Sequence, residues 1–217
     1  MDFEQARFNM IEQQIRPWEV LDSRVLDLLN HVHREDFVPP QYRELAFVDM
    51  NIPLGEGEVM MQPKIEARLL QELSPQSTDI VLEIGTGSGY LTALLATMGK
   101  YVYTVEIRPQ FHESVGERLA AKGFENVTLE LGDGARSWDK HKPYDAIILT
   151  GSVPIMPNSF RESLAPGGRL VAIVGQPPIM EALVTRRVHE TGWQTTSLFD
   201  TSLPPLINAE TPPAFVF

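Results

Sequence analysis

The stretch Ile80–Glu106, IVLEIGTGSGYLTALLATMGKYVYTVE, decides the fold of this chain. Its first residues, Ile80–Ile84, are mostly apolar and rich in β-branched side chains, which is typical of a strand buried on both faces. A glycine-rich turn at Gly85–Gly89 follows, and leucines at helical spacing predict a helix that stops at Gly99. Tyr101–Val105 is predicted to be a second strand. This order predicts one repeat of a parallel sheet.

The turn indicates a binding site for a cofactor that contains a nucleoside. The three alternating glycines let the backbone turn sharply and a ligand approach closely, and the helix that begins there directs N–H groups at the loop. Glu106 closes the second strand about twenty residues later, where a carboxylate can accept both hydroxyls of a ribose. The alternative interpretation is an ordinary tight turn between a strand and a helix.

The spacing distinguishes two classes of cofactor. A dinucleotide site needs a glycine three residues after the middle one, and Tyr90 occupies that position. Glu83 stands two residues before the turn, where it would repel a diphosphate and attract an ammonium group. The pattern resembles motif I of the class I S-adenosylmethionine-dependent methyltransferases. That resemblance implies S-adenosyl-L-methionine as the cofactor, with Glu83 near its amino group and the glycines beneath its sugar.

Composition limits the other possibilities. The chain has 217 residues, which suits one globular domain. A formal net charge of -11, without a run of Lys or Arg, argues against a nucleic-acid partner. There is no cysteine for disulfides or thiolate metal sites, and we expect no metal site. We see neither a signal peptide nor a membrane-spanning segment, so we expect a cytoplasmic protein without a membrane partner. The oligomeric state is left open.

The first 75 residues are predicted to form a helical and loop section. Apolar residues at helical spacing predict helices over Phe3–Ile15 and in the segment 22–32. Tyr42–Met50 is expected to be irregular. The segment 52–63 is expected to be a turn-rich loop that ends against a helix, with Pro63 at its first position.

Residues 76–217 are predicted to form the cofactor-binding core, and residues 1–217 together a single domain. The further elements expected are a helix from Pro109 to about Ala121, strands at Val127–Leu131, Tyr144–Leu149 and Arg169–Val174, and a hairpin of Ala182–His189 and Gln194–Thr201. The predicted class is therefore α/β: a Rossmann-like, mostly parallel sheet with helices on both faces. The hairpin adds antiparallel strands at one edge.

Polar residues at the carboxyl ends of the strands are the main candidates for the site, because ligands bind there in such sheets. Asp133, in Gly-Asp-Gly, can accept a hydrogen bond from an adenine amino group, but Asp-Gly is also a common turn pair. The residues predicted to bind the cofactor are Glu83, Gly85, Thr86, Gly87, Ser88, Gly89, Glu106, Asp133, Gly134 and Thr150.

Six stretches carry a closer resemblance. They are DFVPPQYRELAFVDMNIPLGEGEVMMQP, VLEIGTGSGYLTALLA, LELGDGARSW, PYDAIILTGS, LAPGGRLVAIVG and LPPLINA. Together they resemble the protein-L-isoaspartate O-methyltransferase family over nearly the whole chain. The resemblance implies a methyltransferase sheet with an N-terminal helical section. It also implies an enzyme that uses S-adenosylmethionine to esterify the abnormal carboxylate of isoaspartyl proteins or peptides, which starts their repair.

The chain departs from this family at one position. The family loop reads Ser-Gln-Pro or Ser-Ala-Pro with the serine as active-site residue, and Met61 stands there, before Gln62 and Pro63. The resemblance thus implies Met61 as the catalytic position and Gln62 and Pro63 as substrate contacts. Methionine offers no donor, and losing one to a charged acceptor costs roughly ten- to hundredfold in rate. Met61 can alternatively be core packing, or line a pocket for a more apolar acceptor.

The expected reaction is an in-line displacement. A carboxylate acceptor is ionised at neutral pH and needs no general base, so the protein mainly positions the two reactants. Three functions remain open at this point: an isoaspartyl methyltransferase, a methyltransferase of the same lineage for another, small and apolar acceptor, and a non-catalytic module that binds S-adenosylmethionine.

Overall fold

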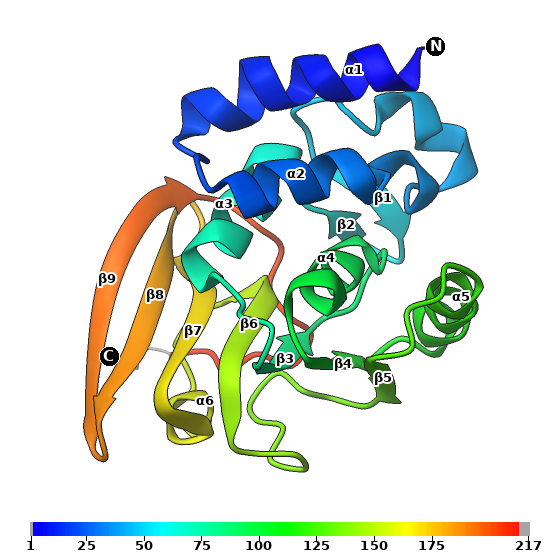
Figure 1. Cartoon of the computed structure of the whole chain (residues 1–217). Coiled ribbons are helices and arrows are strands. Elements are labelled where there is room, and N and C mark those ends of the chain that lie inside the picture. Colours follow the sequence, from blue (N-terminus) through cyan, green and yellow to red (C-terminus); the bar gives the residue numbers. More distant parts are fainter. Residues whose placement is uncertain (1, 213–217) are drawn as a thin grey trace, which may run out of the picture.

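The structure, a computed structural model, describes residues 2–212. Residues 1 and 213–217, which the single-domain prediction includes, lie outside the described residues. In the described part, seven strands form one sheet and two short strands form a separate hairpin (Figure 1). The strands of the large sheet are β3 (Ile80–Ile84), β4 (Tyr101–Glu106), β5 (Val127–Leu131), β6 (Tyr144–Val153), β7 (Leu164–Gln176), β8 (Ile179–His189) and β9 (Gly192–Thr201).

The order of the strands confirms the predicted fold class. The sheet runs β5-β4-β3-β6-β7-β8-β9, with the strands β3 to β7 parallel and β8 and β9 antiparallel at one edge. The order reverses at β3, because the next two strands lie on one side of it and β6 on the other. Such a switch point opens a crevice at the carboxyl ends of the strands, where ligands bind.

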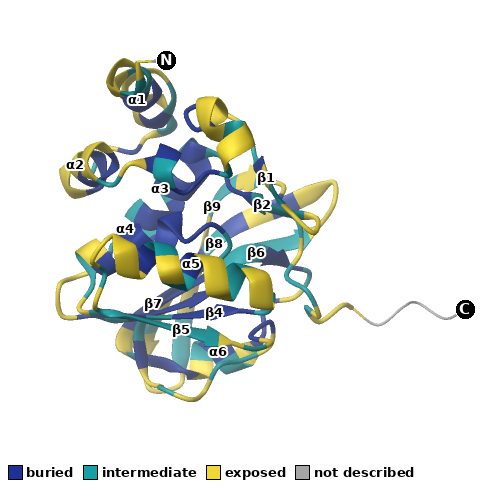
Figure 2. Cartoon of the chain, turned by 90° about the vertical axis from the view of Figure 1, so that its right-hand side faces the viewer, coloured by how far each residue is buried: buried dark blue, intermediate teal, exposed yellow. Residues whose placement is uncertain are grey.

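Helices cover both faces of the sheet unequally. α3 (Pro63–Leu73), α4 (Tyr90–Met98) and α5 (Pro109–Ala121) lie on one face, and the short α6 (Asn158–Glu162) lies on the other (Figure 2). None of the helices in the described part is both long and apolar enough to span a lipid bilayer.

Alternating side chains of the strands build two cores, one on each face. Val81, Val102 and Ile148 belong to the core beneath α3 and α4, whereas Leu82 and Ile147 belong to the core on the side of α6. Each neighbouring pair in a strand points to opposite faces because the side chains of a strand alternate with a period of two. Since both faces are apolar, the strands are almost continuously hydrophobic, which is why β3 could be recognised from sequence.

Several strands are longer than predicted. β6 continues past Leu149 to Val153, and β7 begins at Leu164 rather than at Arg169. The register shows how β7 accommodates these residues: Tyr144 pairs with Leu164, but the next pair joins Ala146 to Arg169. The extra residues of β7, between Leu164 and Arg169, therefore form a bulge or irregularity within the strand.

The N-terminal section is helical, as predicted, but its helices are irregular. The helix predicted over 3–15 is α1 (Phe3–Met10) followed by a π-helical turn, Ile11–Ile15. α2 (Ser23–His31) begins after Asp22, whose carboxylate accepts the Arg24 N–H.

A hairpin replaces the loop predicted over 52–63. β1 (Ile52–Gly55) and β2 (Glu58–Met60) pair antiparallel about Glu56 and Gly57. Both central residues have positive φ, 54° and 83°, which is the backbone of a type I′ turn. The sequence did not reveal the hairpin because Glu-Gly is not among the favoured pairs for this turn.

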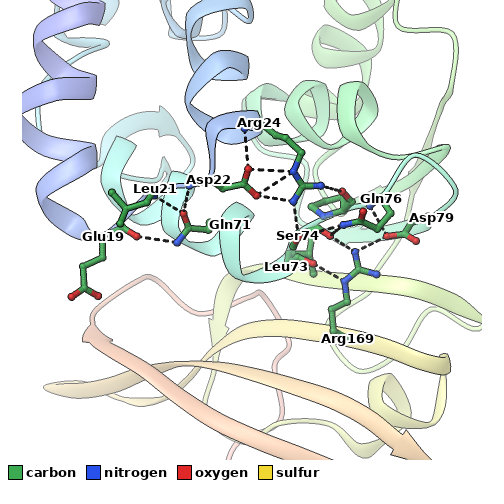
Figure 3. Close-up of polar contacts among 11 residues, drawn as sticks. Glu19, Leu21, Asp22, Arg24, Gln71, Leu73, Ser74, Gln76, Asp79 and Arg169 are labelled. Carbon is green, nitrogen blue, oxygen red and sulfur yellow. Dashed lines mark hydrogen bonds and ion pairs between the residues drawn. The ribbon is translucent and has the colours of Figure 1, made fainter.

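Arg169 fastens the end of α3 to β7 (Figure 3). Its side chain is buried and donates to the carbonyl of Leu73 from Nε and to the carbonyl of Ser74 from Nη2, each at 2.6 Å. Nη2 also donates to Asp79 Oδ2 at 2.5 Å, just before β3. Carbonyls at the end of a helix lack partners within it, so these bonds satisfy two of them and fix α3 against the sheet.

Candidate active site

Two adjoining cavities lie at the carboxyl ends of β3, β4 and β6. The first spans about 650 Å³ and the second about 300 Å³, both including the solvent at their open mouths, and they share Val59, Gly85, Gly87 and Thr150. The first is bounded mainly by strand ends and the C-terminal segment, whereas the second extends toward β2, α3 and α4.

The glycine-rich loop separates the two cavities, and its conformation requires glycine. Gly85, Gly87 and Gly89 have positive φ of 95°, 54° and 81°. A Cβ on Gly85 would overlap the Thr150 hydroxyl, and one on Gly89 would lie 2.5 Å from a methyl group of Val115. Both positions therefore combine a left-handed backbone with a close neighbour, which only glycine tolerates.

Glu106 lies at the end of β4 and lines the first cavity, as predicted. It is buried, and its two carboxylate oxygens accept the backbone N–H groups of Gly87 at 3.0 Å and Arg108 at 2.9 Å. Each oxygen keeps a second lone pair for a ligand. These bonds orient the carboxylate and tie it to the glycine loop.

Asp133 also lines the first cavity, but it serves as a turn residue as well. Its Oδ1 accepts the Ala135 N–H at 3.1 Å, and its Oδ2 accepts the side-chain amide of Asn208 at 2.8 Å. Gly134 lines the same cavity, and a Cβ there would lie 2.9 Å from Ile84 Cδ1. The two interpretations of Asp133, turn former and site residue, are therefore compatible.

The segment 203–207 closes the first cavity on one side. The backbone N–H and C=O of Ser152 bond to Pro204 O at 3.0 Å and Leu206 N at 2.9 Å, and the Ser152 hydroxyl donates to Leu203 O at 2.8 Å. Sequence reasoning did not assign these residues to the site, although the stretch LPPLINA was singled out.

Glu83 lines the second cavity and is fully buried. Its Oε2 accepts the hydroxyls of Thr92 at 2.5 Å and Thr104 at 2.6 Å, and Thr86 is hydrogen-bonded in turn to Thr104. Its Oε1 has no hydrogen-bond partner within residues 2–212. Burial raises the pKa of Glu83 to about 8 despite the two hydroxyls. The second cavity thus has an acid at its wall that a cation would satisfy.

Two of the predicted loop residues have additional roles. Thr150 lies inside β6 rather than at its end, in the shifted register between Ile148 and Ser152, and its hydroxyl donates to the Gly85 carbonyl at 2.5 Å. Ser88 lines the second cavity, and its hydroxyl accepts the Tyr90 N–H at 3.2 Å. Thr150 therefore braces the glycine loop from the neighbouring strand.

The residues predicted to act on the substrate separate in the structure. Met61 lines the second cavity and is 5% exposed. Gln62 and Pro63 line neither cavity. The Gln62 N–H donates to Asn51 Oδ1 at 3.1 Å, and Pro63 is the first residue of α3, as its fixed φ favours. Those two residues shape the loop rather than the cavity wall.

Comparison with known proteins agrees with this geometry. A family model described as Protein-L-isoaspartate(D-aspartate) O-methyltransferase (PCMT) matches residues 5–202. A Protein-L-isoaspartate O-methyltransferase 2 of Pelobacter propionicus is 38% identical over 208 residues, 95% of this chain and 92% of that protein. A Protein-L-isoaspartate O-methyltransferase of Roseiflexus castenholzii is 39% identical over 207 residues, 95% of this chain and 94% of that protein.

Solved structures share the fold. One described as a protein-L-isoaspartate O-methyltransferase aligns with a TM-score of 0.78 at 22% identity, over 93% of this chain and 65% of that chain. Another, from Plasmodium falciparum and described as a beta-aspartate methyltransferase (PCMT) in complex with S-adenosyl-L-homocysteine, has a TM-score of 0.78 at 17% identity, over 95% of this chain and 98% of that chain.

The fold and the family match are those of an S-adenosylmethionine-dependent methyltransferase with a Rossmann-like sheet. The family model and the relatives span nearly the whole chain. The chain belongs to the protein-L-isoaspartate(D-aspartate) O-methyltransferase family, and S-adenosyl-L-methionine is its cofactor.

Proposed function

We propose that this enzyme methylates the free carboxylate of isoaspartyl residues in proteins and peptides. The family match over residues 5–202 carries the proposal, and the relatives that cover the chain have names that describe this activity. The cofactor supplies a sulfonium methyl group, so a carbon–sulfur bond breaks as the ester carbon–oxygen bond forms. Starting the repair of damaged proteins, and doing so in the cytoplasm, belong to the proposal on sequence grounds.

The first cavity fits the nucleoside end of the cofactor. Glu106 is oriented by two backbone N–H groups and retains lone pairs for ribose hydroxyls. Asp133 is oriented by the Ala135 N–H and the side-chain amide of Asn208, and it can accept from an adenine amino group. The bare backbone of Gly85, Gly87 and Gly134 leaves room for the ligand at this wall.

The second cavity fits the amino-acid end of the cofactor. The unsatisfied Oε1 of Glu83 is a buried acceptor, and an ammonium group would supply both a hydrogen bond and a compensating charge. Thr86, Ser88 and Gly89 complete the loop at this end; the first two line the cavity, whereas Gly89 shapes the turn. The meeting of both cavities at Gly87 matches a ligand with a nucleoside at one end and an amino acid at the other.

The acceptor end needs positioning rather than proton transfer. An isoaspartyl carboxylate is ionised at neutral pH, so no base has to act on it. We place the acceptor in the part of the second cavity that Met61 lines, beside the amino-acid end of the cofactor, and Met61 contributes only an apolar surface there. Ser88 lines the same cavity, and within residues 2–212 its hydroxyl serves only as an acceptor, from the Tyr90 N–H, so its proton is available for a carboxylate.

A pair of synthetic peptides tests the proposal. The two peptides have the same sequence and differ only in an isoaspartyl or an ordinary aspartyl linkage, and each is incubated with methyl-labelled S-adenosylmethionine. We expect base-labile label, released as methanol, from the isoaspartyl peptide only. If the isoaspartyl peptide released no more label than the aspartyl peptide, the assigned acceptor would be refuted. Methyl transfer to small carboxylic acids instead would place the acceptor in another class.

A further inference from the structure

Arg34 is a buried cation behind the second cavity. It follows α2 in a short 3₁₀ turn, Arg34–Asp36, and only 1% of its surface is exposed. A guanidinium has five N–H donors, and burying it without partners is costly. The partners of the Arg34 guanidinium therefore indicate its structural role.

Four separate segments converge on this guanidinium. Nε donates to the Ala46 carbonyl at 2.8 Å, and Nη2 donates to the Met61 carbonyl at 2.5 Å. Nη1 forms an ion pair with Glu66 in the first turn of α3. The centre of the Tyr90 ring lies 5.2 Å from the Arg34 Cζ, where α4 begins after the glycine loop. One side chain thus joins the N-terminal section, the loop before α3, α3 and α4.

Two of these partners form the wall of the second cavity. Met61 and Glu66 both line it, so Arg34 holds that wall from behind. The planar fork of arginine can satisfy two carbonyls and a carboxylate in fixed directions, which the single ammonium of lysine cannot. Burial raises the pKa of Glu66 and Arg34 opposes this effect, so the pair also limits the charge beside Glu83.

We propose that Arg34 is the positioning residue of the acceptor site. By holding the Met61 carbonyl and Glu66, it sets the distance between the acceptor wall and the glycine loop that carries the cofactor. The identity of the acceptor in this inference rests on the proposed function. An alternative role, general stabilisation of the N-terminal section, predicts no selective effect on the acceptor.

A second buried pair provides a matched control. Arg7 and Glu35 form an ion pair of 2.5 Å, with side chains 7% and 4% exposed, also within the N-terminal section. Neither residue lines either cavity. Arg7→Lys therefore perturbs a buried Arg–Glu pair of the same kind whose two residues line neither cavity.

Steady-state kinetics with the isoaspartyl peptide separate the two roles. We expect Arg34→Lys to lower kcat/KM for the peptide by about tenfold or more, with the KM for the cofactor changed less than about twofold. Glu66→Gln, which keeps the shape and the acceptor oxygen, should show a smaller loss with the same selectivity. Arg7→Lys should change neither constant. Equal losses in Arg34→Lys and Arg7→Lys, or a parallel rise in the KM for the cofactor, would overturn the assignment.

The methyl resonance of Met61 gives a readout that needs no substrate. With methionines labelled at the methyl carbon, Met61 is assigned by its loss in Met61→Leu. We expect its resonance to move in Arg34→Lys and Glu66→Gln and to stay in place in Arg7→Lys. If the wild-type enzyme does not methylate the isoaspartyl peptide, the proposed function fails. The spectrum alone then decides whether Arg34 positions the wall of the second cavity. A Met61 signal that stays in place in Arg34→Lys and in Glu66→Gln would refute the inference. Where Arg34→Lys folds poorly, an unmoved signal in Glu66→Gln alone would refute it.

Discussion

Arg108 donates two hydrogen bonds to the same oxygen of Glu58, from Nε at 3.0 Å and from Nη2 at 2.8 Å. Glu58 begins β2 and lines the first cavity, and Arg108 follows two residues after Glu106. Nη2 also donates to the Glu56 carbonyl at 2.8 Å. The β1–β2 hairpin is therefore held beside the first cavity by the side chain of Arg108, which follows the end of β4.

Removing the hydrogen bonds of Arg108 to Glu58 and Glu56 should weaken cofactor binding modestly. The pair is partly exposed, at 22% and 29%, so we expect Arg108→Ala to cost about 1 kcal/mol, or roughly fivefold in the Kd of S-adenosylhomocysteine. The difference should shrink at high salt, because solvent-exposed pairs are screened. Calorimetric titration at low and high salt measures both effects. Lys142→Ala, which breaks an exposed pair with Asp139, is the control; an equal change there would contradict the prediction.

The stability of the free enzyme should fall with rising pH because of Glu83. Its folded pKa of about 8 lies above the value of about 4.3 in an unfolded chain, so between these values the native state binds more protons. The contribution of Glu83 to the free energy of unfolding therefore decreases as pH rises through this window, by at most about 1.4 kcal/mol per pH unit. Glu83→Gln should remove that slope in chemical unfolding from pH 5 to 8. Glu113→Gln, on the exposed face of α5, should keep it.

Cofactor affinity should show the opposite dependence on pH. An ammonium group beside Glu83 favours the ionised carboxylate, so binding releases a proton that the buried acid holds in the free enzyme. Between pH 7 and 6 we expect the affinity for S-adenosylhomocysteine to fall by up to about tenfold. In Glu83→Gln it should be weaker and nearly independent of pH over this range. A wild-type affinity that does not change between these pH values would contradict the role assigned to Glu83.

Periodicity and turn chemistry in the sequence were sufficient to predict the fold class and the position of Glu106 at the end of β4. The apolar run of β3, the glycine loop and Glu106 are local features, and parallel strands bring their ends together whatever the details of the loops. Thr104 was within reach of the same reasoning. It precedes Glu106 by two residues, so both side chains point to the same face of the sheet. On that face Thr104 lies beside Glu83 of the neighbouring strand and donates to its carboxylate.

The remainder of the site depends on contacts between distant segments, which periodicity does not encode. Arg34 is separated from Met61 by 27 residues and from Glu66 by 32, and its neighbours in sequence gave no sign that it would be buried. Likewise, Leu203–Ile207 becomes a cavity wall only because Ser152 binds its backbone from β6. Such long-range polar contacts follow from the packing of the whole chain.

Replacing Met61 by the serine that the sequence resemblance implies at this position should raise isoaspartyl activity. Met61 lines the second cavity without a donor, and a hydroxyl there can bond to the acceptor carboxylate. We expect Met61→Ser to increase kcat/KM for the isoaspartyl peptide by about tenfold, with a loss of roughly 2 kcal/mol or more of stability for the missing side chain. Met10→Ser removes a methionine that is equally buried but lines neither cavity, and it should lower stability without the gain. Equal activities of the two variants would show that this position does not limit the reaction.

The hydroxyl of Tyr90 should lower stability rather than raise it. It is buried without a hydrogen-bond partner in the described part of the chain, while the ring packs at 5.5 Å from that of Phe37. Tyr90→Phe keeps the ring and removes the unsatisfied hydroxyl, so the free energy of unfolding should rise by about 1 kcal/mol. Tyr144→Phe is the matched control, because that hydroxyl donates to the Trp138 carbonyl at 2.8 Å, and its loss should cost about 1 kcal/mol. Chemical unfolding of the two variants should therefore give changes in the free energy of unfolding of opposite sign. If Tyr90→Phe lost as much stability as Tyr144→Phe, the Tyr90 hydroxyl would have a hydrogen-bond partner in solution.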